Sequence, residues 1–195
     1  MELYLIAFLN KRLIMKIIKH FLTITKHRYL VRKYCFKVGL YYQGLTHDLS
    51  KYSFKEFFTS AKYYSGEYSP INNERQDKGY SDVWLHHKGR NKHHPEYWVD
   101  VDKDKKFFGP QIMPKRYLVE MLLDRISAAK IYNKNNYSKT KPLEYLERTK
   151  HACPMHEQTL RELTRLLILY QEMDEKLFLK YLRKYLKNDK NSLKY

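Results

Sequence analysis

Apolar residues recur with a helical period along most of the chain, and the first long segment of this kind runs from Met15 to Val38. Positions 27, 31, 34 and 38 fall on one stripe of that segment, which places His27 among apolar neighbours. Gly39 follows as a helix stop. The pattern predicts one long helix here and a second helix from about Leu40 to Lys51.

The next helices are indicated by residues typical of helix ends. Ser53 and Glu56 have the S-x-x-E spacing of a capping box, which predicts a helix that Gly66 closes. Residues 68–79 contain Pro70 and two asparagines, and we expect a loop there. Ser81 is placed to cap a short helix that carries Trp84 and a pair of histidines, and Pro95 suits the first turn of another.

In the second half of the chain, Pro114 opens the clearest helix, which extends to about residue 132. Residues 100–109 are predicted to be a polar loop, and residues 133–142 a turn-rich connection. A further helix is predicted over 156–187, with a break at 172–174 because of its length. Strand-like pieces are very short, so the sequence predicts an all-α fold.

The N-terminus predicts a cationic amphipathic helix. Residues 3–9 are continuously apolar but too few to span a bilayer, and neither a preceding cationic region nor a cleavage site indicates a secretory signal. Lys11, Arg12, Lys16 and Lys19 interrupt the apolar pattern. Packing of this helix against the body is favoured over binding to a membrane surface. We therefore expect a soluble, cytoplasmic protein without a membrane span.

Composition adds a candidate class of partner. The chain has 195 residues, enough for a substantial core, and its 38 Lys and Arg against 21 Asp and Glu give a formal charge of +17. Such a charge favours polyanions such as nucleotides, nucleic acid or an acidic membrane surface. Cys35 and Cys153 are far apart and predict neither a disulfide framework nor a thiolate metal site.

One carboxylate lies on the apolar stripe of the helix that Pro114 opens. Asp124 shares helical spacing with Tyr117, Met121, Ala128 and Ile131. A buried carboxylate needs a cation, a metal or strong donors. Periodicity alone slightly favours a salt bridge, for instance with Arg28 or Arg125. Glu120 is expected to face a different side of the helix from Asp124.

A second group of candidate ligands lies near the end of the predicted helix over 40–51. Asp48 shares a helical face with Tyr41 and Leu45, and His47 precedes it. His27 on the preceding helix and Asp124 on a later one complete a set of two imidazoles and two carboxylates. Such a set, without thiolate, suits a divalent transition metal such as Mn, Fe, Co, Ni or Zn.

The segment HHKGRNKHH, residues 86–94, contains four of the nine histidines. His86 and His93 are seven residues apart, as are His87 and His94, so spacing does not select which of each pair faces a site. The cations between them could bind phosphate or form a solvated loop. Phosphate binding is favoured for Arg90, whereas the alternatives are even for Lys88 and Lys92.

The pattern of His27, His47-Asp48 and Asp124, with the local form HDLSK, resembles the HD-domain superfamily of metal-dependent phosphohydrolases. More narrowly, HDLSKYS, AKYYSG and WLHHKGRNKHH resemble a family of small, mainly bacterial proteins without an assigned activity. That resemblance covers about residues 15–171. Because those proteins typically begin near the equivalent of Met15, it implies a single HD-like helical domain over 15–195. Residues 1–14 would then be an N-terminal extension or a mis-assigned start.

The resemblance implies roles for individual residues. Metal ligands would be His27, His47, Asp48 and Asp124, with a second metal or a general acid supplied from His86, His87, His93 and His94. Lys51 would contact a substrate phosphate, and with His87, Arg90 and His94 it forms the expected catalytic set. Ser50 stands where the superfamily often has Gly.

Together these features predict a hydrolase that uses one or two divalent transition-metal ions on a small phosphate ester, such as a nucleotide. The alternative is a helical protein that binds metal, nucleotides or nucleic acid without catalysis. The sequence leaves the metal, the substrate and the oligomeric state open.

Overall fold

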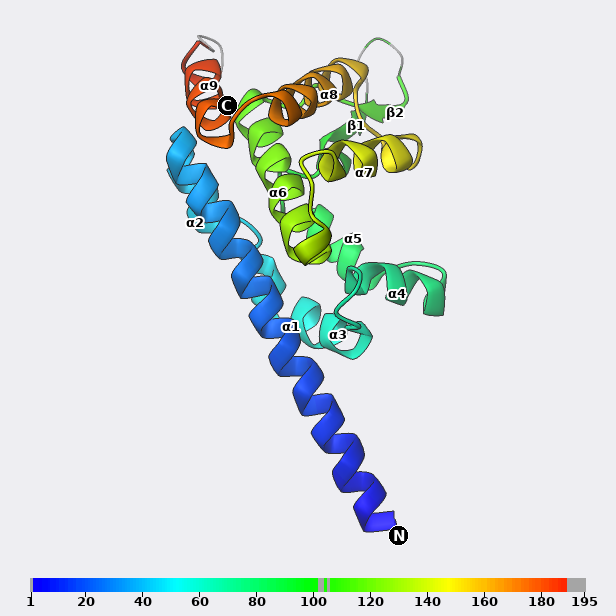
Figure 1. Cartoon of the computed structure of the whole chain (residues 1–195). Coiled ribbons are helices and arrows are strands. Elements are labelled where there is room, and N and C mark those ends of the chain that lie inside the picture. The colour runs from blue at the N-terminus through cyan, green and yellow to red at the C-terminus, as the bar shows by residue number, and fades with distance from the viewer. Residues whose placement is uncertain (1, 102–103, 105, 189–195) are drawn as a thin grey trace.

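The protein is almost entirely helical, which confirms the all-α prediction. The computed structural model describes residues 2–101, 104 and 106–188 (Figure 1). Its α-helices in chain order are α1 (Glu2–Val38), α2 (Tyr41–Thr46), α3 (Phe54–Tyr63), α4 (Pro70–Lys78), α5 (Asp82–Lys88), α6 (Lys115–Asn133), α7 (Lys141–Thr149), α8 (Glu157–Glu172) and α9 (Glu175–Lys187). Short 3₁₀ turns cover Leu49–Tyr52, Pro95–Trp98, Lys134–Asn136 and Lys150–Ala152.

The hydrophobic core lies where α6 packs against α1, α8 and α9 (Figure 1). Each helix contributes fully buried apolar side chains, for example Val31 from α1, Leu122 from α6, Leu167 from α8 and Phe178 from α9. Removing these side chains from water is the main favourable term in folding. The core therefore fixes α1 and α6, the two longest helices, relative to one another.

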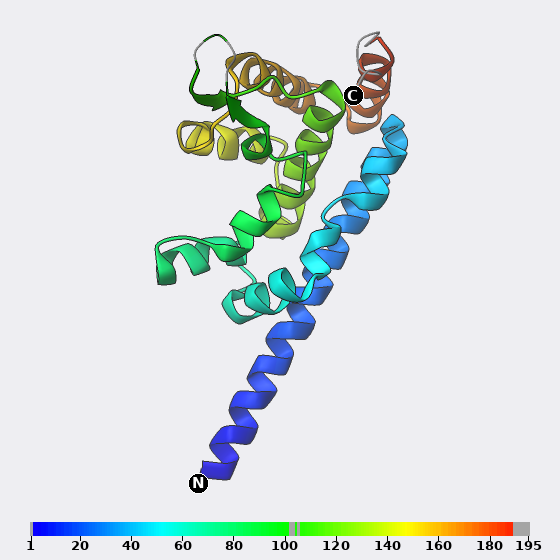
Figure 2. The ribbon, with the colours of Figure 1, turned by 180° about the vertical axis from the view of Figure 1, so that it is seen from behind.

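The segment from α2 to α5 leaves this core and lies along the middle of α1. There α3 packs on α1 and is itself covered by α4 and α5 (Figure 2). Beyond α3, the N-terminal half of α1 extends away from all the other helices in both views. The helix is continuous across position 15, so the expected domain boundary there has no counterpart in the secondary structure.

Two predicted helix ends are confirmed by the backbone. α1 ends at Val38, and Gly39 takes a φ of 91°, a left-handed conformation that favours glycine. The predicted C-terminal helix is divided at the expected place, between α8 and α9. Asp174 caps α9 there, since its carboxylate accepts from the backbone N–H groups of Lys176 and Leu177.

The predicted loop over 68–79 is wrong, because residues 70–78 form α4. Pro70 occupies the first turn, where its missing N–H has no intrahelical partner to lose, and Gly79 ends the helix with a φ of 81°. The helix is mostly polar, and buried Glu74 anchors it by accepting from the Ser81 hydroxyl at 2.5 Å. Proline and glycine therefore delimit a helix here rather than a loop.

Two further elements differ from the prediction. Within the expected polar loop, Val99–Val101 (β1) and Phe108–Pro110 (β2) form a short antiparallel hairpin, with Val99 opposite Pro110. Positions 102, 103 and 105 of that loop lie outside the described residues. Helix α7 was not predicted, and it packs on α8 through buried Leu146.

The prediction of no membrane span agrees with the helices of the described residues. None of them combines the length with the apolar character that crossing a bilayer requires.

Candidate metal centre

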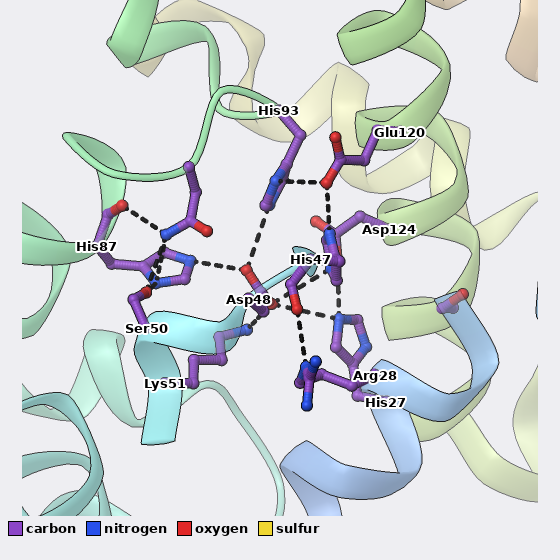
Figure 3. A network of polar contacts seen from close by, with 12 residues as sticks. His27, Arg28, His47, Asp48, Ser50, Lys51, His87, His93, Glu120 and Asp124 are labelled. Atoms are coloured by element: carbon purple, nitrogen blue, oxygen red, sulfur yellow. Dashed lines mark hydrogen bonds and ion pairs between the residues drawn. The ribbon is translucent and has the colours of Figure 1, made fainter. Parts of the chain in front are cut away.

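The side chain of His27 points from α1 towards α6, at the level where α2 ends (Figure 3). Its Nε2 lies 2.8 Å from Asp124 Oδ1 and 3.7 Å from Asp48 Oδ2. The apolar stripe of α1 thus places His27 at the boundary of the core, as predicted. Asp124 contacts this histidine, so the salt bridge to Arg28 or Arg125 is wrong. Arg28 instead donates to the backbone carbonyl oxygens of Leu45 and His47, and the Arg125 guanidinium lies over the Tyr145 ring.

A break in the backbone brings His47 and Asp48 into the interior. α2 ends at Thr46, His47 caps it, and Asp48 has a φ of 54° and a ψ of 25°. This left-handed conformation is tolerated by aspartate and asparagine better than by other residues with side chains. It turns the chain so that both side chains are buried, with Asp48 only 1% exposed.

The sequence predicts Asp48 on one helical face with Tyr41 and Leu45, and this explanation of its burial is wrong. Tyr41 and Leu45, its supposed companions on a helical face, are each 55% exposed. A continuous helix over residues 40–51 would have carried Asp48 with them towards solvent. The turn at Asp48, and not helical periodicity, places its carboxylate inside.

His27, His47, Asp48 and Asp124 come together as one group of possible ligands. Their nearest ligand atoms all lie within 4.8 Å of one another, a spacing compatible with a single metal ion. His47 Nε2 lies 3.3 Å from Asp48 Oδ2 and 3.6 Å from Asp124 Oδ1. The sequence prediction for these four residues is thus consistent with the geometry.

The histidine-rich segment supplies a second group on the other side of Asp48. Asp48, His87, His93 and His94 also have ligand atoms within 4.8 Å of one another. His87 Nε2 and His93 Nε2 lie 3.1 Å and 3.4 Å from Asp48 Oδ1. Since the first group faces Oδ2, the two oxygens of Asp48 face separate sets of histidines.

The donor atoms themselves indicate that the site fits a metal. The Nε2 atoms of His27, His47, His87, His93 and His94 and the Oδ1 atom of Asp48 are buried. Some of them lie within ion-pair distance of one another or of Asp124, but none has the geometry of a hydrogen bond within the described structure. Buried polar atoms are rarely left without a partner. Five converging imidazole nitrogens and a carboxylate oxygen form a donor set that a divalent transition metal satisfies.

Two glutamates hold the opposite edges of these imidazole rings. His47 Nδ1 donates to Glu120 Oε1 at 2.9 Å, and His93 Nδ1 lies 3.2 Å from the same oxygen. His87 Nδ1 donates to Glu56 Oε2 at 2.8 Å. A carboxylate on one ring nitrogen fixes the tautomer that leaves the other nitrogen free to bind a metal. Glu56 belongs to none of the groups of possible ligands, whereas Glu120 also forms a third group with His47 and His93.

Neither glutamate was identified from the sequence. Glu120 lies one helical turn before Asp124, so the expectation that it faces another side is wrong, and the i, i+4 spacing could have identified it. Glu56 was assigned to a capping box, and its backbone N–H does donate to Ser53 Oγ. Its side chain, however, turns inward to the histidines. No local signal distinguishes these two uses.

In the first histidine pair only His87 belongs to a ligand group, whereas both members of the second pair, His93 and His94, do. His86 donates to Glu56 Oε1 at 2.6 Å and belongs to neither ligand group. His93 and His94 pack ring to ring at 4.1 Å, and Trp84 lies 4.7 Å from His94. The inclusion of His86 among the metal ligands is thus not supported by its position.

The predicted phosphate-binding cations have different positions. Lys51 Nζ lies 2.5 Å from Asp48 Oδ2, at the edge of the first group. Arg90 is exposed on the surface, and its guanidinium donates to the backbone carbonyl of His86. Lys51 is therefore in contact with the cluster, whereas Arg90 lies outside the network that Figure 3 shows.

Charge within the cluster opposes the effect of burial. Burial favours the neutral form of Asp48, but the charges of His47 and Lys51 outweigh it and hold the pKa of that carboxyl well below its usual range. Burial also favours neutral Lys51, yet the Asp48 carboxylate raises its pKa. Burial and the charges of His93 and His87 lower the pKa of His94. Anionic carboxylates and a neutral imidazole are the forms that bind metal.

Comparison with known proteins adds a family. The sequence model of a family of unknown function (DUF5662) matches residues 16–168. The chain belongs to this family. Membership in DUF5662 assigns no activity, and neither the curated proteins nor the solved structures give a match. Every residue of the two ligand groups lies within the part that the DUF5662 model covers.

Substitution of Glu120 tests its orienting role. We expect Glu120→Gln to weaken metal binding about 10- to 100-fold. The amide of glutamine carries no negative charge, so it orients the His47 and His93 rings less strongly than the carboxylate does. Titration of the metal-free protein with Zn²⁺ or Mn²⁺ measures this. Glu162→Gln, which removes a surface ion pair with Arg165, is the matched control and should bind as the wild type does. Equal affinities of both variants would contradict the assigned role.

Proposed function

We propose that this DUF5662 protein is a metal-dependent phosphohydrolase that uses two divalent transition-metal ions on a small phosphate ester such as a nucleotide. The observation that carries the proposal is the position of Asp48 between two groups of histidines. Its two carboxylate oxygens face separate sets of buried imidazole nitrogens, none of which has hydrogen-bond geometry to a partner in the described structure. The resemblance of the H…HD…D pattern to HD-domain phosphohydrolases supports the same reaction class.

The two ligand groups name the residues that would hold the ions. His27, His47, Asp124 and one oxygen of Asp48 would hold the first, and His87, His93, His94 and the other oxygen the second. Bound divalent ions supply Lewis acidity, lowering the pKa of a coordinated water and polarising a phosphoryl oxygen. The donor set contains no thiolate, which is typical of catalytic rather than structural sites.

The accessible edge of the cluster indicates where a substrate would approach. The side chains of His47, Asp48 and His87 are at most 1% exposed, whereas Asp124 is 18% and Lys51 28% exposed. A phosphate group can therefore reach the cluster beside Lys51. The ammonium group stays protonated at neutral pH, because Asp48 raises its pKa despite burial. It would donate to phosphoryl oxygens and bind the developing negative charge.

An activity assay with a Lys51 variant tests this function. Protein reloaded with Mn²⁺, Co²⁺, Ni²⁺ or Zn²⁺ should hydrolyse members of a panel of nucleotides and aryl phosphates. Lys51→Ala should lower kcat/KM by about 10- to 100-fold, the value of one lost charge-assisted hydrogen bond, while the metal content stays unchanged. Lys55→Ala, which removes an exposed lysine of α3, is the control.

Two results would contradict the proposal. A fully loaded protein that hydrolyses no phosphate ester of the panel would exclude this activity. If it nonetheless binds nucleotides, the non-catalytic alternative would replace it. A loss of activity in Lys51→Ala that follows a loss of metal would show that Lys51 supports the site and not the substrate.

A further inference from the structure

The outer surface of α1 carries apolar side chains that no other part of the described structure covers. Ile14, Ile18, Phe21 and Leu22, here called the outer stripe, are 45–59% exposed. They follow i, i+4, i+7 and i+8 spacing, so they share one face of the helix. The opposite face turns inward, where His20 is 3% and Ile24 6% exposed. The expectation that this helix packs against the body therefore does not hold for the outer stripe.

The apolar surface continues from α1 onto α3. Phe21 lies 6.3 Å from the Phe57 ring, which lies 5.3 Å from Phe58. Phe58 in turn lies 4.8 Å from Phe54, and these two residues are 48% and 82% exposed. Contiguous exposed apolar surface of this kind marks an interaction site.

The charge around the outer stripe limits the choice of partner. From residue 3 to residue 47 the sequence has nine Lys and Arg and no Asp or Glu. Lys11 and Lys26 lie beside the stripe, three residues before Ile14 and four after Leu22. Arg12, Lys16 and Lys19 lie on the adjoining face of the helix, and no carboxylate among the described residues pairs with any of these five cations. A second copy of the chain would bring the same cations into contact, and nucleic acid offers little apolar surface for the stripe.

A cleft on this adjoining face of α1 has the same electrostatic character. Its volume is about 590 Å³, and it lies between the N-terminal half of α1 and the end of α3. Arg12, Lys16, Lys19 and Lys62 line it, with Tyr64, and no acidic residue is among its lining residues. A phosphate group would find four cations there.

We propose that the N-terminal half of α1 binds the surface of an anionic phospholipid membrane. The outer stripe would enter the boundary between headgroups and acyl chains, and Lys11 and Lys26 beside it would contact headgroup phosphates. The cations of the cleft would add to the attraction of the helix to an anionic surface. An anionic bilayer accommodates both the apolar stripe and the surrounding cations, which a second copy of the chain or nucleic acid does not. The free end of α1 extends away from α5 and α6, two of the helices that carry residues of the metal cluster (Figure 2).

Vesicle binding by the whole protein tests this proposal. We expect the wild type to co-sediment with vesicles of equimolar phosphatidylglycerol and phosphatidylcholine, less at high salt, and weakly with phosphatidylcholine alone. The variant Ile18→Glu/Leu22→Glu should bind at least about tenfold more weakly. Ile112→Glu/Leu177→Glu changes two exposed apolar residues away from the N-terminal half of α1 and should bind as the wild type does. Circular dichroism checks that all variants are folded.

Several results would overturn the proposal. Binding that is absent, or equal with and without anionic lipid, would do so, as would unchanged binding of Ile18→Glu/Leu22→Glu. A dimer in light scattering that this variant dissociates, without vesicle binding, would assign the stripe to a second copy of the chain. Binding of inorganic triphosphate with no binding to vesicles would restrict the cleft to free phosphates. None of these measurements depends on metal or hydrolysis, so they are independent of the proposed activity.

Discussion

Asp48→Asn is expected to lose both metal ions. Asp48 is common to the two ligand groups, and each of its oxygens faces a different one. An amide carries no charge and offers one oxygen, so the second group loses its only carboxylate and the first keeps only that of Asp124. Removal of an orienting partner alone weakens metal binding about 10- to 100-fold, and loss of a shared ligand should exceed this range. Metal analysis after gel filtration should find less than one ion per chain.

Asparagine is the appropriate replacement because the backbone at this position is left-handed, with a φ of 54°. Asn tolerates that conformation, whereas Ala would add backbone strain to the loss of the ligand. Asp82→Asn, at a carboxylate 44% exposed, is the matched control and should retain the metal. An Asp48→Asn protein that is folded and keeps two ions would show that Asp48 does not bridge them.

Removal of metal is expected to destabilise the protein. A ligand present at about 100 times its Kd stabilises the native state by about 2.7 kcal/mol per site. For a chain of this length, that corresponds to a fall in Tm of about 5 to 10 °C when the ion is removed. Thermal unfolding with and without a chelator measures the difference. Restoring Zn²⁺ or Mn²⁺, but not Mg²⁺, should reverse it, because imidazole ligands favour transition metals.

The size of this stabilisation should increase with pH. In the metal-free protein, burial opposes the charged form of His47, but Asp48 and Asp124 raise its pKa well above the ordinary value of 6.5. Stability from this protonated form is complete below pH 6.5 and is lost as the pH rises through the folded pKa. Metal binding needs the neutral imidazole and releases that proton. The difference in Tm between loaded and metal-free protein should therefore be larger at pH 8 than at pH 6; a constant or opposite difference would contradict this coupling.

The sequence predicts the helical fold and the identity of the main ligands because both depend on strong local signals. The stripe of α1 predicts the inward position of His27, and the apolar spacing of α6 predicts that of Asp124. Pro114 and Gly39 mark helix ends that the structure confirms. The presence of the cluster follows from residues that stand out against their surroundings, such as a carboxylate on an apolar face.

The details of the site could not be predicted, since they depend on one backbone turn and on contacts between distant segments. Nothing in HDLSK reveals that Asp48 leaves the helix and adopts a left-handed conformation. The choice of His87 over His86 is made by Glu56, which lies 31 residues earlier and holds both rings by different oxygens. Spacing within residues 86–94 carries no information about that partner. α4 was missed because its sequence is mostly polar and it is held by the contact of its buried Glu74 with Ser81. α7 was missed although it is amphipathic, with Leu146 buried in the core.

The central claim is that two divalent metal ions lie on either side of Asp48. Crystals of the purified protein, measured at the absorption edge of the bound metal, test it most directly through anomalous scattering. We predict two peaks, one among His27, His47 and Asp124 and the other among His87, His93 and His94, each within coordination distance of one oxygen of Asp48. A single peak, a peak away from these residues, or none in metal-saturated crystals would contradict the claim.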